Sequence, residues 1–318
     1  MERQSDLKMR GGVSVGLAEA LSSHGCKAFA GGIMKSVGVI GVGLLGTAMA
    51  ERLMSQQFGV VGFDVNESRN AELLGLGGFV AGSAIAVANA SKTIILSLPT
   101  SDHAISVIDQ LLESLTPEHC IIDTTTGAPE QMENNGRRLA DLGVDYLDAT
   151  VGGSSVLARQ GDVTITAGGS IEAYAACLEV FDALARQSFH VGPVGSGARM
   201  KLVMNMVLGL NRAVLAEGLC FAKSLGFDLD KTLEVLQAGP AQSAAMMTKG
   251  RKMIEENFEP QARLAQHLKD VRLMISAASQ ANASIPMTTM HAEILEQAEQ
   301  MGFGNADNSA VIKAFQSH

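Results

Sequence analysis

The sequence predicts an α/β protein in which a doubly wound parallel sheet is followed by an all-helical second domain. Three observations support this prediction. Short apolar runs, which suit buried strands, alternate with helix-like segments as far as residue 191. A glycine-rich turn joins the first of these strands to the helix that follows it. From Gly197 onward the strand signals stop, and helical periodicity continues to the end of the chain.

The composition bounds the class of protein. A chain of 318 residues is long enough for two domains, and 47% hydrophobic with 18% charged residues is typical of globular proteins. The net charge of −9, without a basic run, disfavours nucleic acid or an anionic membrane as a partner. No apolar run approaches the roughly 20 residues of a membrane span. Four scattered cysteines predict reduced thiols in the cytoplasm, and the dispersed histidines predict no metal site.

Residues 1–34 precede the first predicted strand. They carry basic and acidic side chains and then a stretch rich in Gly, Ser and Ala, without the continuous apolar region of a signal peptide. We interpret them as a poorly ordered N-terminal extension, or as the result of a start codon placed upstream of a functional start at Met34. A targeting segment is the alternative.

The most informative motif follows the first predicted strand, residues 37–40. It reads Gly-x-Gly-x-x-Gly, in which Gly41 permits the tight turn, Gly43 lets the backbone approach a pyrophosphate, and Gly46 lets the helix pack closely. The helix start presents unpaired N–H groups to the phosphates. The next strand ends at Asp64, whose carboxylate can accept from a ribose hydroxyl and would repel a 2′-phosphate. These features predict a Rossmann-type dinucleotide site that prefers NAD to NADP.

The other elements of the first domain continue the alternation in order. Strands are predicted at residues 78–80, 93–97, 120–123, 146–147, 163–166 and 189–191, and helices at 66–74, 83–89, 102–115, 171–184 and from Pro129 onward. Leu98, Pro99 and residues 124–126 follow strands directly, and ligands of parallel sheets bind at the carboxyl ends of strands. The domain boundary is predicted at residues 193–197, which gives domains of residues 35–194 and 195–318. Residues 198–225 contain no proline and predict a long helix that joins the two domains.

Two candidate catalytic side chains lie near the start of that helix. Lys201 and Asn205 are four residues apart and therefore share one face. A lysine beside a nicotinamide can give a proton to a substrate oxygen as hydride arrives, and take it back in the reverse direction. Asn205 can orient the substrate. From position alone, an isolated lysine on a helix is usually a solvated surface charge, and the catalytic role is the less frequent alternative.

Four stretches resemble the β-hydroxyacid dehydrogenase family, which includes 3-hydroxyisobutyrate dehydrogenase and tartronate semialdehyde reductase. They are the glycine motif at residues 38–50, the Asp-Thr-Thr-Thr of residues 123–126, the loop at 148–154 with the segment 161–169, and the Gly-x-Gly-x-x-x-Lys-x-x-x-Asn of residues 195–205. In the helical half, residues 216–218, 268–270 and 302–307 also fit the family. The resemblance runs from residue 37 to about residue 313.

The resemblance implies a fold, an activity and a site. The fold is a Rossmann domain and an all-helical domain joined by a long helix, in a homodimer or homotetramer. The activity is reversible oxidation, by NAD(P), of the alcohol of a small 3-hydroxy carboxylic acid such as 3-hydroxyisobutyrate. Lys201 is implied as the catalytic acid/base and Asn205 as a substrate-positioning residue. The implied cofactor-binding residues are Gly41, Gly43, Leu44, Leu45, Gly46, Asp64, Val65, Leu98, Pro99, Thr126 and, from the helical domain, Lys269.

One departure from the family leaves the substrate open. The family's substrate loop is commonly Asp-Ala-Pro-Val-Ser-Gly-Gly, whereas Thr150 replaces the proline here and Gly152 replaces the serine. The backbone N–H groups of Gly152 and Gly153, with the Ser154 or Ser155 hydroxyl, can still bind a carboxylate, so an acid with an altered tail is expected. The alternatives are a semialdehyde or imine reductase on the same scaffold, a non-catalytic NAD-binding protein and, more remotely, a methyltransferase.

Overall fold

The computed structural model describes residues 26–29 and 32–316, with side chains from Lys35 onward. The chain divides into two compact units, Met1–Lys201 and Leu202–His318. Helix α10 (Ser196–Ser224) contributes its first residues to the first unit and the remainder to the second. The division therefore falls inside the long helix, a few residues after the boundary predicted at residues 193–197.

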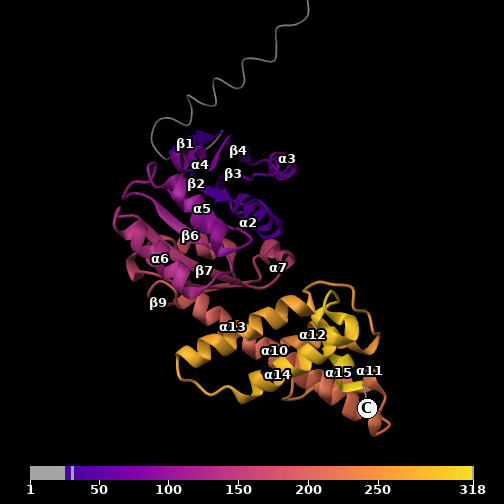
Figure 1. Ribbon diagram of the computed structural model, residues 1–318. Coiled ribbons are helices and arrows are strands. Elements are labelled where there is room, and N and C mark those ends of the chain that lie inside the picture. Colours follow the sequence, from indigo (N-terminus) through magenta and orange to yellow (C-terminus); the bar gives the residue numbers. More distant parts are fainter. Residues whose placement is uncertain (1–25, 30–31, 317–318) are drawn as a thin grey trace, which may run out of the picture. The chain divides into compact units, whose positions relative to one another are not determined.

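The first unit is built on one sheet of nine strands in its described part, shown from indigo to magenta in Figure 1. The strand order is β4-β3-β2-β5-β6-β7-β8-β9, with β1 paired to β2. The strands are β1 (Cys26–Phe29), β2 (Gly32–Ile40), β3 (Gly59–Phe63), β4 (Phe79–Val80), β5 (Thr93–Leu96), β6 (Cys120–Asp123), β7 (Asp145–Gly152), β8 (Thr164–Gly168) and β9 (Gln187–Gly192). All neighbouring strands are parallel except β1 with β2 and β7 with β8.

Helices cover both faces of this sheet, as the continuous apolar strands predict. They are α2 (Leu44–Ser55), α3 (Glu67–Gly75), α4 (Ala84–Ala90), α5 (Ser101–Leu111), α6 (Pro129–Ala140), α7 (Ser155–Gln160), α8 (Ile171–Ala176) and α9 (Leu178–Leu184). Successive strand residues enter different cores. Ile95 packs in the core that contains Met49 of α2, whereas Ile94 packs in the core that contains Ile108 of α5. This alternation is the signature of a strand buried on both faces.

The structure differs from the sequence expectations in four places, one of which is the unpredicted helix α7 at Ser155–Gln160. Strand β7 extends to Gly152 instead of ending at residue 147, because Asp148 and Thr150 are buried, at 1% and 4% exposure, by polar partners in other segments. The helix predicted at residues 171–184 is two helices, divided at Cys177. Of the proposed N-terminal extension, residues 1–25 and 30–31 lie outside the described residues, and the described part forms β1 and the start of β2, which the sequence did not predict.

The described residues of the second unit are helical. With α10, the helices are α11 (Leu229–Ala238), α12 (Ala244–Ile254), α13 (Leu264–Gln280), α14 (Pro286–Ala298) and α15 (Ile312–Gln316), with a π-helical turn at Glu299–Phe303 and a 3₁₀ turn at Asn308–Val311. Their core includes Leu219, Leu268 and Leu295, each fully buried. This arrangement agrees with the predicted all-helical second domain.

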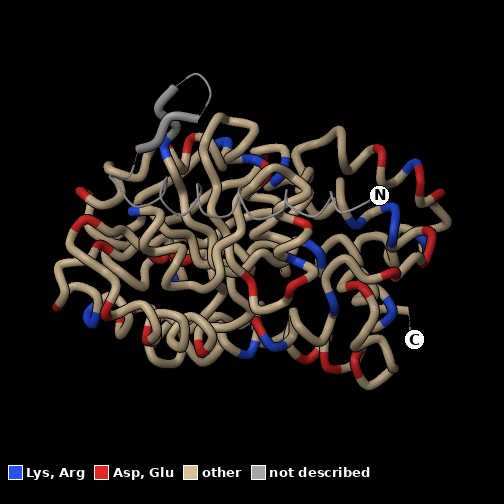
Figure 2. Tube along the Cα trace, turned by 90° about the horizontal axis from the view of Figure 1, so that it is seen from above, with Lys and Arg blue, Asp and Glu red and all other residues tan. Residues whose placement is uncertain are grey.

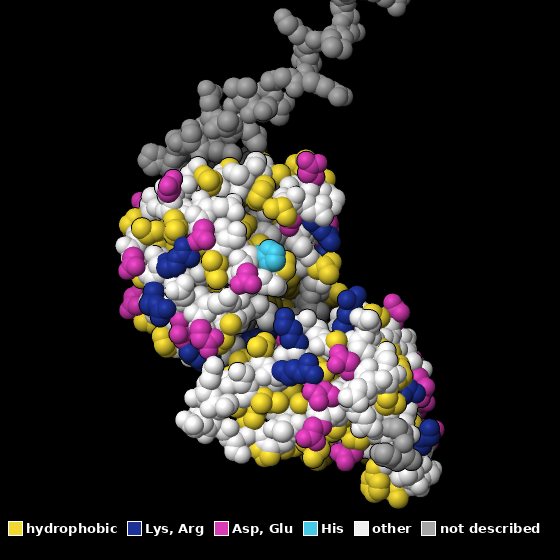
Figure 3. Space-filling model, in the orientation of Figure 1, with side chains coloured by type: hydrophobic (Ala, Val, Ile, Leu, Met, Phe, Trp, Pro, Cys, Tyr) yellow, Lys and Arg dark blue, Asp and Glu magenta, His cyan; other side chains and the backbone are white. Residues whose placement is uncertain are grey.

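Acidic and basic residues are mixed in the described part of the chain. Lys and Arg positions are interspersed with Asp and Glu positions along the trace in Figure 2, and on the face in Figure 3 charged side chains are scattered among neutral and apolar groups. Among the described residues, α10 is one helix that length and composition would allow to cross a membrane. A single helix of this kind is weak evidence, because core helices of soluble proteins have the same properties.

Candidate active site

The glycine turn between β2 and α2 has the geometry that its sequence predicts. Gly41 has a φ of +91°, and a Cβ there would lie 2.3 Å from the Ser97 carbonyl oxygen. A Cβ at Gly46 would lie 2.0 Å from the Gly41 carbonyl oxygen, so glycine is needed where the helix crosses the turn. Gly43 caps α2 without a side-chain hydrogen bond, and nothing lies within 4 Å of where its Cβ would be. The first N–H groups of α2 are therefore available to an anion.

Asp64 is fixed beside this turn by hydrogen bonds to both carboxylate oxygens. The Val42 N–H donates to Oδ2 at 2.8 Å, and the Asn66 N–H donates to Oδ1 at 2.9 Å. The Asn70 side chain accepts from the backbone N–H of Asp64 and donates to its carbonyl, both at 2.8 Å. Each carboxylate oxygen keeps a further lone pair. Asp64 can thus accept from a ribose hydroxyl while it also holds the glycine turn.

A pocket of about 520 Å³ lies at the carboxyl ends of β2, β3, β5 and β6. The predicted cofactor residues that line it are Gly41, Gly43, Leu44, Leu45, Asp64, Val65, Leu98, Pro99 and Thr126. Gly46 lies against Gly41, and Lys269 belongs to the second unit. The structure therefore gathers the residues that the sequence placed at strand ends into one cavity, with the N-terminus of α2 on its wall.

One wall of the pocket was not anticipated. It is the face of α5 formed by His103, Ser106, Val107 and Gln110. Thr100 caps this helix, and its hydroxyl lies 2.7 Å from the His103 Nδ1. These four residues have the three- and four-residue spacing of one helical face. That spacing, in the helix directly after Leu98-Pro99, is the signal that could have identified them.

Lys201 points at the predicted substrate loop. Its Nζ donates to the Val151 carbonyl oxygen at 2.6 Å, next to Gly152 at the end of β7. Gly153 and Ser154 are exposed, and the Ser154 hydroxyl caps α7 by accepting from the Leu157 N–H at 3.3 Å. The ammonium and the proposed carboxylate-binding backbone are thus neighbours within the first unit.

Asp148, which the sequence did not single out as a site residue, fixes the start of α10. Its Oδ1 accepts from the Gly195 N–H and its Oδ2 from the Ala198 N–H, both at 2.8 Å. Burial raises the pKa of Asp148 to about 6, against the lowering effect of these two amide hydrogen bonds. A carboxylate at a helix N-terminus also interacts favourably with the helix dipole. Asp148 is therefore a positioning residue that sets the turn from which Lys201 projects.

Thr150, which stands where the family commonly has proline, also helps to hold the start of α10 in place. Its hydroxyl lies 2.9 Å from the Thr166 hydroxyl on β8 and donates to the Gly197 carbonyl at 3.2 Å. A proline at this position could make neither contact. Thr150 thus links β7, β8 and the first turn of α10.

The Asp-Thr-Thr-Thr segment divides into buried and exposed parts. The Asp123 carboxylate is fully buried and accepts from the Thr125 N–H at 2.9 Å and from the Tyr146 hydroxyl at 2.8 Å. Burial raises the pKa of Asp123. Thr124 donates to the Leu96 carbonyl at 2.7 Å, whereas Thr126 is exposed and faces the pocket. Asp123 thus shapes the strand end that presents Thr126.

The two remaining predicted site residues belong to the second unit. Asn205 follows Lys201 by one turn of α10 and is half-buried, and Lys269 is exposed on α13. Their predicted roles toward substrate and cofactor remain predictions. Within residues 35–316, no group of three or more His, Cys, Asp or Glu side chains could hold a metal ion.

Known proteins resemble this chain over almost its whole length. Residues 36–192 match the NAD-binding domain of 6-phosphogluconate dehydrogenase, and residues 195–315 match the NAD-binding domain of NADP-dependent 3-hydroxyisobutyrate dehydrogenase. The chain is 31% identical to 2-(hydroxymethyl)glutarate dehydrogenase of Eubacterium barkeri, over 88% of this chain and 94% of that protein. It is 28% identical to 2-hydroxy-3-oxopropionate reductase of Escherichia coli, over 88% and 97%. The structure of Mycobacterium tuberculosis 3-hydroxyisobutyrate dehydrogenase with L-serine has the same fold, with a TM-score of 0.80 at 23% identity over 89% of this chain and 100% of that one.

Proposed function

Because the chain belongs to the β-hydroxyacid dehydrogenase family and is an NAD(P)-dependent hydroxyacid dehydrogenase, we propose that it transfers a hydride between NAD and the alcohol carbon of a small 3-hydroxy carboxylic acid. The observation that supports this most directly is the Lys201 ammonium, held at the Val151 carbonyl beside the glycines of the substrate loop. A proton donor and a set of N–H groups for a carboxylate thus lie together in the unit that contains the dinucleotide pocket.

In this mechanism the chain binds, orients and moves a proton, while the nicotinamide, when bound, supplies or accepts the hydride. The N–H groups of α2 hold the diphosphate, and Asp64 holds the ribose. The N–H groups of Gly152 and Gly153, with the Ser154 hydroxyl, bind the substrate carboxylate. Lys201 donates its proton to the substrate oxygen during reduction, and its neutral amine takes that proton during oxidation. Asn205 orients the same oxygen.

Replacing Lys201 with alanine tests the acid/base role. General acid–base catalysis typically contributes about 10²- to 10⁴-fold, so kcat should fall by that factor in Lys201→Ala. The affinity for NAD, measured by calorimetry, should stay within about two-fold, because Lys201 does not line the pocket. Lys223→Ala, an exposed lysine on the same helix, is the matched control and should keep full activity. Near-normal kcat in Lys201→Ala would refute the assignment.

The preference for NAD over NADP is proposed on the electrostatics of the pocket. Asp64 lines it, and the residues that line it include no lysine or arginine to neutralise a 2′-phosphate. Asp64→Arg should therefore move the ratio of kcat/KM for NADP to that for NAD upward by at least about ten-fold, equivalent to about 1.4 kcal/mol. The ratio is the proper readout, since loss of the hydrogen bond to Val42 weakens both cofactors. Asp141 is exposed and does not line the pocket, so Asp141→Ala should leave the NADP-to-NAD ratio of kcat/KM unchanged. If Asp64→Arg has the same ratio as the unmodified chain, the contact between Asp64 and the ribose is excluded.

The substrate and the physiological direction remain to be assigned among close relatives of the same reaction. A panel read at 340 nm in both directions separates them, with 3-hydroxyisobutyrate, L-serine and 2-(hydroxymethyl)glutarate as alcohols and tartronate semialdehyde as the carbonyl compound. Preferential reduction of the semialdehyde would favour the reductase alternative. Binding of NAD without turnover of any compound would favour a non-catalytic NAD-binding protein.

We also propose a cytoplasmic homodimer or homotetramer without nucleic-acid or membrane partners. The net charge of −9 and the mixed surface charge support the latter point. Val207, Val214 and Phe221 of α10 are 53%, 55% and 63% exposed, which favours association with a further subunit. Sedimentation analysis of the full chain measures the oligomeric state, and a monomer at micromolar concentration would contradict the proposal.

A further inference from the structure

Three basic side chains from three helices meet in the second unit. They are Arg212 on α10, His267 on α13 and His291 on α14, with the two imidazole centroids 5.2 Å apart. The helices come together at Gly209, where a Cβ would lie 2.5 Å from the His267 Nε2 and 2.9 Å from the His291 Cε1. Arg212 lies three residues further along α10, on the same face. The glycine thus lets both imidazoles reach the helix that carries the arginine.

The polar atoms of this cluster are shielded from solvent and lack partners. The Nε2 atoms of both histidines, and the Nε and Nη1 of Arg212, make no hydrogen bond with any described residue. His267 is 7% exposed and His291 is 3% exposed. Buried polar groups in folded proteins almost always have a partner, which is often an ordered water or an ion. Four such atoms gathered in one place indicate an absent ligand.

Arg212 shares the negative charge of one carboxylate with Lys249. Asp307 is the carboxylate whose charge acts on Arg212, but its oxygens are already occupied. Lys249 donates to both at 2.9 Å, and Ser309 and the N–H groups of Gln261 and Ala262 supply the other hydrogen bonds. Burial lowers the pKa of Arg212 to about 10, so the guanidinium stays charged at neutral pH.

The two imidazoles remain neutral beside that charge. Burial and the charge of Arg212 lower the pKa of His267 to about 2 and that of His291 to about 4. A neutral imidazole can present one N–H group, and an arginine presents only donors. The cluster therefore offers several donors and one positive charge. This chemistry repels a metal cation, and a water molecule would satisfy the N–H groups but not the charge.

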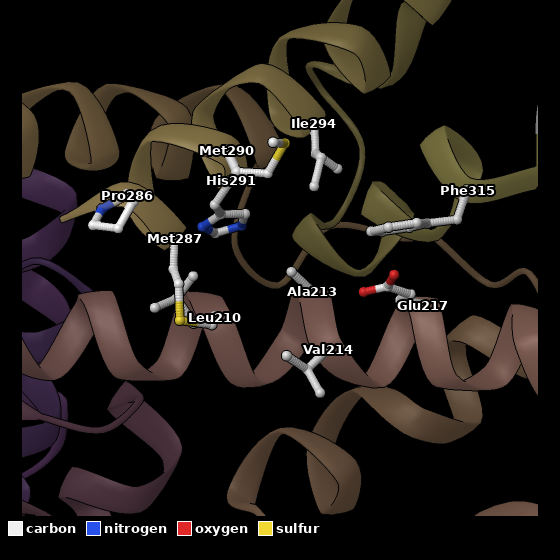
Figure 4. Close-up of a pocket in the computed structure, with 10 residues that line it drawn as sticks. All are labelled: Leu210, Ala213, Val214, Glu217, Pro286, Met287, Met290, His291, Ile294 and Phe315. Carbon is white, nitrogen blue, oxygen red and sulfur yellow. The ribbon is translucent and has the colours of Figure 1, made fainter.

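A cavity of about 310 Å³ touches the cluster at His291 alone, because Arg212 and His267 do not line it. It lies between α10 and α14, and Figure 4 shows the His291 imidazole on its wall among Met287, Met290 and Leu210. The Glu217 carboxylate also lines this cavity, so a small anion that enters it passes one negative charge before it reaches His291.

We propose that Arg212, His267 and His291 form a binding site for a small oxyanion of carboxylate chemistry. The expected ligand is a free small anion rather than the substrate, because eleven residues of α10 separate Arg212 from Lys201, which is about 16 Å along the helix. The site itself does not depend on the proposed dehydrogenase reaction.

The first experiment detects the anion without turnover. The full-length chain, labelled with ¹⁵N-histidine, is titrated with sodium acetate at constant ionic strength, and the imidazole signals are followed by NMR. Of the seven histidines, His267 and His291 should have imidazole chemical shifts that change with acetate and then saturate. The signals missing from the spectra of His267→Gln and His291→Gln assign these two residues. Arg212→Met should remove the response, whereas Arg272→Met, an exposed arginine on α13 paired with Glu296, should keep it. Absence of any saturable shift in the unmodified chain overturns the proposal, whether or not Arg212→Met folds.

The second experiment separates the anion site from the substrate loop. Lys201→Ala should keep the acetate response of His267 and His291, because Lys201 lies about 16 Å from Arg212 along α10. Loss of that response in Lys201→Ala would place the anion at the substrate loop and overturn the proposal.

Discussion

The two units of the molecule differ in whether certain buried ionisable groups have hydrogen-bond partners. In the first unit, the buried carboxylates Asp123 and Asp148 each accept two hydrogen bonds from backbone amides or a tyrosine hydroxyl. In the second unit, Arg212, His267 and His291 place shielded nitrogens where no described residue accepts from them. The satisfied acids are part of the architecture that positions Lys201. The unsatisfied bases indicate a ligand that the chain itself does not provide.

The difference follows from the secondary structure around each group. A carboxylate only accepts, and the ends of strands and the starts of helices supply N–H groups that are not otherwise used. A guanidinium only donates, and the carbonyls of an all-helical unit are mostly consumed by hydrogen bonds within the helices. Buried acids are therefore easily satisfied in the α/β unit, whereas buried bases in the helical unit require either another side chain or a ligand. For Lys249 this side chain is Asp307, with which it forms an ion pair.

The largest expected effect comes from adding a methyl group to a glycine in each environment. A Cβ at Gly197 would lie 2.0 Å from the Asp148 carbonyl oxygen and 2.9 Å from the Thr166 carbonyl, which are backbone atoms that cannot move aside. Gly197→Ala should therefore destabilise the first unit by about 3 kcal/mol or more. At Gly209 the obstacles are the ends of two imidazole side chains rather than backbone atoms, and alanine gains about 1 kcal/mol of helix propensity. Gly209→Ala should change stability by no more than about 1 kcal/mol.

Urea unfolding measures this contrast. Tyr146 and Tyr174, the two tyrosines of the chain, both lie in the first unit, and the chain has no tryptophan, so tyrosine fluorescence reports that unit and Gly197→Ala. Helical circular dichroism at 222 nm includes the second unit and is the readout for Gly209→Ala and Gly218→Ala. Gly218→Ala, on the same helix with nothing within 4 Å of the added carbon, is the control and should stabilise by about 0.5–1 kcal/mol. An equal decrease in the free energy of unfolding for Gly197→Ala and Gly209→Ala would show that the two environments do not differ in rigidity.

The architecture of the first unit was predictable from the sequence because its signals are local. Apolar runs, the glycine turn and the acid after the second strand all lie within a few residues of the structure that they specify. The extension of β7 was not predictable in this way. Asp148 and Thr150 have the composition of a loop, and they are buried only because the start of α10, distant in the sequence, provides their partners.

The site residues likewise differ in whether they have a local sequence signal. The predicted cofactor residues at strand ends line one pocket, whereas the α5 face around His103 was not predicted because its three- and four-residue spacing is that of any helical face. The cluster of Arg212, His267 and His291 has no sequence signal, since each residue alone is unremarkable in its helix. Only the packing of three helices around Gly209 brings them together.

A second expected effect is a pH dependence of opposite sign in the two units. The pKa of Asp148, about 6 in the folded chain, lies above its ordinary value of 3.8, so the folded first unit binds a proton more readily than the unfolded chain. That stabilisation is present below about pH 4 and is lost as pH rises through about 6. The pKa of His291, about 4, and that of His267, about 2, lie below 6.5, so their contribution is present above pH 6.5 and is lost as pH falls. Between pH 6.5 and 4, acid should weaken the second unit by about 3 kcal/mol for His291 alone while it strengthens the first.

Unfolding in urea at pH 7 and pH 4.5 tests both signs in one chain. At pH 4.5 the loss of helical circular dichroism at 222 nm should begin at lower urea than the change in tyrosine fluorescence, because the second unit unfolds first. Asp148→Asn should remove most of the gain of the first unit in acid, although the buried Asp123, whose pKa is also raised, contributes in the same direction. His291→Gln should reduce the acid sensitivity of the second unit, since a glutamine cannot titrate there. If the free energy of unfolding of both units falls as pH falls, Asp148 and Asp123 do not bind protons more readily in the folded chain than in the unfolded chain. The two units would then not differ in the sign of their pH dependence.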